Sequence, residues 1–129
     1  MNKILVEVSV GELLDKISIL EIKQEKIKDP EKLKFINDEH SILKDQLNKN
    51  VSSDEKLNNM FKSLKEINSR LWIIEDDKRS CEKNSDFTEN FIKLSRDVHF
   101  LNDDRAKIKL EINTHTGSKI KEIKEYVKY

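Results

Sequence analysis

Four polar residues near the C-terminal end of the chain recur at the spacing of a single helix face. In a helix they would stand at positions i, i+3, i+7 and i+11 of one ridge, and they are Asn102, Arg105, Lys109 and Asn113. Two basic side chains and two amides on one ridge can recognise a phosphate or a carboxylate by charge-assisted hydrogen bonds. An earlier segment begins the same spacing with Trp72, Glu75 and Arg79. Together these residues form a candidate ligand-binding site for an anionic sugar phosphate or nucleotide.

Arg105 also interrupts an apolar stripe, which supports a second interpretation. The apolar residues on either side of it recur every three or four positions: Phe91, Leu94, Val98, Leu101, Ile108 and Ile112. A charged residue in such a seam often fixes helix register and oligomeric state by pairing with a carboxylate of the facing helix. If the loop at residues 84–86 closes an antiparallel hairpin, Arg105 faces the region of Glu66 and Asn68, and its partner is expected to be Glu66 or a neighbour. We favour this structural ion pair and keep the ligand site as the alternative.

The other reactive residues predict neither a metal site nor a catalytic nucleophile. Two acidic pairs have the spacing of those that hold Mg²⁺ in helical nucleotide pyrophosphohydrolases, namely Glu12 with Asp15 and Glu122 with Glu125. They lie at opposite ends of the chain and in the reverse order. The histidines show no ligand spacing to one another or to Cys81, and two glycines are too few for a glycine-rich phosphate loop. We therefore expect no metal and no cofactor, while the question of enzymatic activity stays open.

The composition and charge of the chain argue against two classes of binding partner. The 129 residues predict a single domain, residues 1–129, and 25 basic residues balance 25 acidic ones. A chain without net charge is not expected to bind nucleic acid or an anionic membrane surface. No apolar run approaches the roughly 20 residues that span a bilayer, and the N-terminus does not resemble a signal peptide. Together with the presence of only one cysteine, these features predict a cytoplasmic protein.

Caps and apolar stripes predict a helical hairpin in the first half of the chain. Ser9 followed by Glu12 forms a capping box, which starts a helix over about residues 10–28. Asp29 can cap a second helix and Pro30 suits its first position. So short a connection indicates two antiparallel neighbours.

The second half of the chain repeats this arrangement. A polar loop at residues 48–56 precedes a third helix, and a break at residues 83–90 precedes a fourth. The fourth helix continues to about residue 114, and Gly117 supplies its stop. The fold class is therefore mainly α, an antiparallel helical bundle of two hairpins with coiled-coil-like apolar stripes.

The two ends of the chain predict a small β element beside the bundle. Residues 3–8 alternate in the manner of a short strand with one buried face. Residues 118–129 suit either a helical turn or an edge strand, and we favour a strand that pairs with residues 3–8. The reason is that a lone N-terminal strand needs a partner for its backbone amides.

Three segments in order along the chain resemble a family of small bacterial and phage proteins known as a domain of unknown function. They are "VEVSVGELLDKISILEIKQEKIKDPEKL", "LWIIEDDKR" and "NDDRAKIKLEIN", the last followed by "GS". The resemblance implies occurrence near, or fusion to, glycosyltransferase and surface-polysaccharide functions. We expect a helical accessory protein that forms a homodimer or another homo-oligomer and binds a protein partner such as a glycosyltransferase. The alternative function is the small-molecule binder or enzyme described for the polar ridge.

Overall fold

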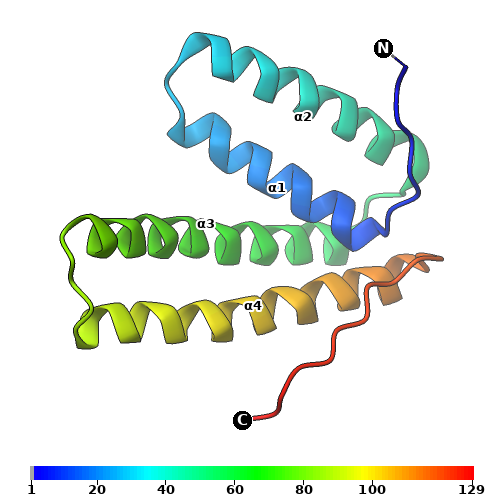
Figure 1. Ribbon diagram of the computed structural model, residues 1–129. Coiled ribbons are helices and arrows are strands. Elements are labelled where there is room, and N and C mark those ends of the chain that lie inside the picture. Colours follow the sequence, from blue (N-terminus) through cyan, green and yellow to red (C-terminus); the bar gives the residue numbers. More distant parts are fainter. Residues whose placement is uncertain (1) are drawn as a thin grey trace.

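The computed structural model describes residues 2–129, and its four helices form two hairpins (Figure 1). The first hairpin comprises α1 (Val10–Lys26) and α2 (Pro30–Asn50), and the second comprises α3 (Glu55–Lys83) and α4 (Glu89–Thr116). α1 lies between α2 and the second hairpin and packs on both α3 and α4, whereas α2 packs on α1 alone. The prediction of a mainly helical bundle is confirmed.

Local capping explains where the first three helices begin. The Ser9 hydroxyl accepts a hydrogen bond from the amide of Glu12, Asp29 accepts from Glu31, and Asp54 accepts from Leu57. α1 ends at Lys26, two residues earlier than expected, because Ile27 already has an extended backbone. α4 begins after Thr88, whose own side chain makes no cap; Asp86 instead accepts from the Thr88 amide and hydroxyl. Gly117 ends α4 with a left-handed backbone, as predicted.

The predicted β element is wrong for the residues that the structure describes. Residues 2–9 and 118–129 contain no strand, and the two segments leave the bundle in different directions (Figure 1). Ile4 and Leu5 are each 88% exposed, so the alternating pattern here does not report a buried face. The C-terminal segment, which we call the tail (residues 118–129), runs back beside α4. Tyr129 packs edge-on against Phe100 and bonds to Asp103. A tail bound to α4 is not available to pair with residues 3–8.

The apolar core lies where α1 meets the second hairpin. Leu14, Leu57, Leu64 and Ile112 form its buried centre. α2 contributes no buried residue and only borders this core, through Leu47. The position of α1 against α3 and α4 therefore decides which polar side chains are enclosed with the core.

Candidate functional site

A buried lysine joins three segments of the chain that are far apart in the sequence. Lys109 of α4 is 5% exposed, and its Nζ lies 2.7 Å from Glu12 Oε2 and 3.6 Å from Asp15 Oδ2, both on α1. Glu122 Oε2 of the tail lies 3.2 Å from the same nitrogen. One ammonium group thus connects α1, α4 and the tail.

Asp15 forms the second half of this cluster. Its carboxylate is almost fully buried and receives the Arg105 guanidinium at 3.2 Å. Its other oxygen accepts from Asn68 Nδ2 of α3 at 2.8 Å, and the same amide nitrogen donates to Ser18 Oγ. A carboxylate removed from water requires several such donors, since burying a charge without partners is costly. We call Glu12, Asp15, Arg105, Lys109 and Glu122 the ion-pair cluster.

Asn113 holds the first turn of α1 against α4. Its Oδ1 accepts a 2.7 Å hydrogen bond from the amide of Gly11, one of the amides that a helix leaves without an internal partner. A Cβ atom at position 11 would lie 2.6 Å from the backbone oxygen of Lys109 and 2.9 Å from Asn113 Oδ1. The two helices can approach this closely because residue 11 has no side chain.

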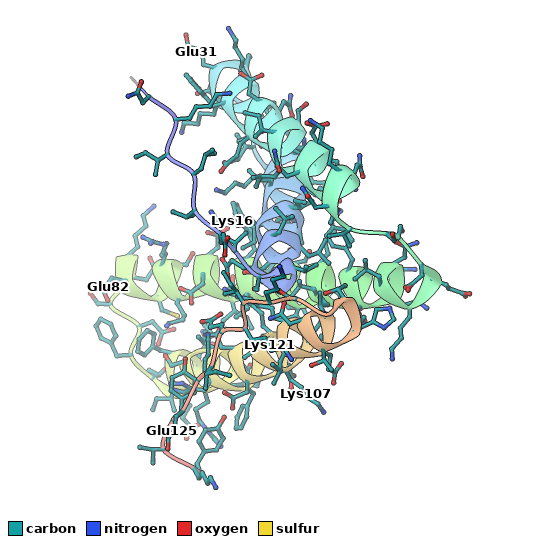
Figure 2. All side chains as sticks on the ribbon, turned by 90° about the vertical axis from the view of Figure 1, so that its right-hand side faces the viewer. Lys16, Glu31, Glu82, Lys107, Lys121 and Glu125 are labelled. Carbon is teal, nitrogen blue, oxygen red and sulfur yellow. The ribbon has the colours of Figure 1, made fainter. Side chains whose placement is uncertain are left out.

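The tail closes the site from the other side. Ser118 Oγ accepts from the amide of Val10 at 3.2 Å and donates to the carbonyl of Ile120. Lys124 lies 3.5 Å from Glu122, so the tail brings a further cation beside the cluster. Figure 2 shows this segment leaving the end of α4 and passing Lys121 before it reaches Glu125.

The contacts of Lys109 also shift proton affinities. Burial by itself lowers the pKa of the Lys109 ammonium, but the hydrogen bond to Glu12 and the charges of Asp15 and Glu12 outweigh it, and the pKa lies above its usual value. The hydrogen bond from Lys109 lowers the pKa of Glu122, and Lys124 lowers it further. Both groups are therefore charged at neutral pH.

The structure brings together three of the residues proposed from the sequence. Arg105, Lys109 and Asn113 share the face of α4 that meets α1. Asn102 is exposed on α4, Glu75 and Arg79 are exposed on α3, and Trp72 is partly buried. Among residues 2–129, these four are not joined to the ion-pair cluster by any hydrogen bond or salt bridge.

The expected partner of Arg105 was wrong. The expected hairpin register places Glu66 level with Asp104, and the two line one groove between α3 and α4 with Lys107. Successive residues of a helix point about 100° apart, so Arg105 is directed to a different side from Asp104. That side meets α1, where Asp15 replaces Glu66 as the partner.

Sequence reasoning missed the acidic half of the site. Glu12 and Asp15 were considered together only as a metal motif, and their separation along the chain from Glu122 argued against a common site. In the structure all three carboxylates surround the Lys109 ammonium. Glu12 was expected to complete a capping box, but its carboxylate bonds to Lys109 instead. The sequence does contain one sign of these contacts. Gly11, Glu12 and Asp15 lie within five residues of one another at the start of α1.

The arrangement can bind anions but is largely neutralised by its own carboxylates. Each cation of the cluster contacts at least one carboxylate of the chain, and the ammonium occupies the space between the three acids. Within residues 2–129, no three acidic, histidine or cysteine side chains are grouped so that they could hold a metal ion. The described helices also include none long and apolar enough to cross a membrane.

These features define a helical protein of two hairpins, tied together by a buried ion-pair cluster that includes the C-terminal tail. The chain belongs to the family of unknown function DUF6165, whose sequence pattern matches residues 4–128. No curated protein and no solved structure matches the chain.

Proposed function

We propose that the protein is a helical interaction module that forms a homodimer through the outer face of α2. The observation that carries this proposal is the open side of that helix. α2 packs on α1 alone and has no buried residue, and its Phe35 and Ile42 are 75% and 64% exposed. These two residues are seven apart, the heptad spacing at which helices pair in coiled coils.

The size and charge of α2 suit pairing with a second copy. A helix of 21 residues is about 31 Å long, enough to form one side of a standard interface. It carries four lysines and four acidic residues, so two copies approach without net repulsion. The N-terminal segment adds further exposed apolar side chains at Ile4, Leu5 and Val6, and Figure 2 shows it to one side of α1 and α2.

The test is the oligomeric state in solution, measured by sedimentation over a range of concentrations. We expect a dimer, and we expect Ile42→Glu and Phe35→Glu to yield monomers with unchanged helix content, because each places a charge in the interface. Ile73→Glu is the matched control, since Ile73 is 51% exposed on α3, away from the proposed interface. A monomeric wild-type protein, or a dimer that Ile42→Glu leaves intact, would overturn the proposal.

The family resemblance supports a partner from surface-polysaccharide assembly, such as a glycosyltransferase, for this dimer. The chain has a single cysteine, Cys81, and therefore needs no oxidising compartment for an internal disulfide; we place the encounter in the cytoplasm. Titrating purified dimer into a purified glycosyltransferase tests this part, with Phe35→Glu as the comparison. We expect a complex with the wild-type protein, and absence of binding by both proteins would contradict it.

A further inference from the structure

A cavity of about 250 Å³ lies between α4 and the tail, next to the ion-pair cluster. α4 and the tail both line it, with Ala106, Lys107, Lys109, Leu110, Asn113, Glu122 and Lys124. The lining contains three lysines and one carboxylate, in a chain that carries no net charge. The cavity is therefore a locally positive site on a neutral protein.

Lys109 and Glu122, which meet in this cavity, differ in how firmly the protein holds them. The Lys109 side chain is 7% exposed and belongs to a long helix, and Glu12 and Asp15 hold its ammonium from behind. The Glu122 side chain is 45% exposed and belongs to the irregular tail. Displacing an exposed carboxylate costs little, because water replaces its contacts. The cation is fixed, whereas its third carboxylate can be exchanged.

We propose that this cavity binds a small dianion such as a phosphate group, and that Glu122 occupies the position of this ligand on Lys109 in the ligand-free protein. Without Glu122, the lining keeps three lysines, Lys107, Lys109 and Lys124, and no carboxylate; of these lysines, Lys109 alone pairs with Glu12 and Asp15. The two other lysines then have no carboxylate partner in the lining, which suits a dianion better than a single carboxylate.

An uncharged donor adds directional recognition. Asn113 lines the cavity, and the amide of Gly11 already occupies its Oδ1. Its Nδ2 is therefore the group that donates to a phosphate oxygen beside the Lys109 ammonium. The cavity is smaller than the roughly 300 Å³ of the smallest ordinary ligand pockets, so it suits a compact anion better than a whole nucleotide.

Isothermal titration of inorganic phosphate into the full chain, at slightly alkaline pH, tests the proposal. Removing an internal competitor raises the apparent affinity by the reciprocal of the fraction of sites that it left open, about tenfold if Glu122 occupies nine sites in ten. We therefore expect Glu122→Gln to bind phosphate more tightly than wild type. Glu125→Gln is the matched control, because it removes the same charge from the same tail at an exposed position that does not line the cavity. It should bind as the wild type does.

Loss of a cation should have the opposite effect. Lys124→Gln is expected to weaken phosphate binding several-fold, and Lys128→Gln, an exposed tail lysine that does not line the cavity, should leave it unchanged. Neither variant alters a buried residue, so both should fold. Lys109→Gln should abolish binding, with its helix content measured alongside to establish folding.

Two results would overturn the proposal: equal phosphate affinity in Glu122→Gln and Glu125→Gln, or no phosphate binding by any variant at millimolar concentration. Titration of glucose 1-phosphate identifies the source of the phosphate. Affinity equal to that of inorganic phosphate assigns the site to the free ion, and tighter binding assigns it to a sugar phosphate; both support a dianion site.

Discussion

Gly11 donates its backbone amide to the side-chain oxygen of Asn113 over 2.7 Å, and this contact fixes the first turn of α1 on α4. A Cβ atom at position 11 would lie within 3 Å of both a backbone oxygen and the Asn113 side chain. Every carboxylate that α1 contributes to the ion-pair cluster lies within four residues of this point. The geometry of the site therefore depends on the close approach of two backbones.

Gly11→Ala is expected to lower the free energy of unfolding by about 1–3 kcal/mol, because the two helices must separate to admit the methyl group. Urea unfolding followed by circular dichroism measures the effect. Gly117→Ala provides the comparison, since a Cβ there meets nothing within 4 Å but the residue has φ of 68°. Gly117→Ala should lower the free energy of unfolding by about 1–2 kcal/mol, because only the left-handed backbone conformation disfavours the alanine. A Gly11→Ala variant as stable as wild type would contradict the close contact.

Asp15 and Arg105 should be energetically coupled. Asp15→Asn leaves Arg105 and Lys109 with fewer carboxylates, and we expect it to destabilise the protein by about 1–3 kcal/mol, less than for a fully buried pair because the Arg105 side chain is 29% exposed. A double-mutant cycle with Arg105→Met measures the interaction directly, with an expected coupling of about 0.5–2 kcal/mol. The cycle with Arg79→Met, an exposed arginine of α3, serves as control. Additive effects of Asp15→Asn and Arg105→Met would show that the pair contributes no interaction.

The docking of the tail should weaken in acid. The pKa of Glu122 lies below its usual value in the folded protein because Lys109 bonds to its carboxylate. A group with a lowered folded pKa contributes stability above its unfolded pKa and loses it as the pH falls through the folded value. The stability difference between wild type and Glu122→Gln should therefore be constant above the ordinary pKa of a glutamate, about 4.3, and decline below it. Thermal melts of both proteins over this range provide the measurement, and a difference that persists in strong acid would contradict the pairing.

Removal of the two terminal segments should have unequal effects. Deleting residues 2–7 removes only exposed side chains, so the free energy of unfolding should change by no more than about 0.5 kcal/mol. Deleting residues 119–129 removes the Glu122 contact and the packing of Tyr129 on Phe100, which should cost about 1 kcal/mol or more. That loss corresponds to a fall of about 3–5 °C in Tm. Equal melting temperatures for the two deletions would contradict the docked tail.

The helices of this protein were predictable because their determinants are local. A Ser9 hydroxyl reaches an amide three residues away, and Pro30 fits a first helical turn whatever packs around it. Apolar stripes repeat over every helix, so their faces could be assigned without knowledge of their partners. The hairpins followed from the short connections.

The ends of the chain were predicted less well, because alternation alone does not reveal what a segment contacts. Residues 3–8 have a strand-like pattern, but a strand forms only where another segment offers its backbone groups. The tail instead binds α4 through Glu122 and Tyr129, contacts that depend on the position of Lys109 and Phe100 in space.

The sequence by itself determined the four helices, the two hairpins and the shared face of Arg105, Lys109 and Asn113, since all of these depend on residues within a few turns of one another. Only the tertiary structure decided that Asp15 is the partner of Arg105 and that Glu12 and Glu122 meet at one ammonium. The physical reason is that these contacts depend on how α1 crosses α4. That crossing is set by the packing of Leu14 and Ile112 and by the missing side chain of Gly11.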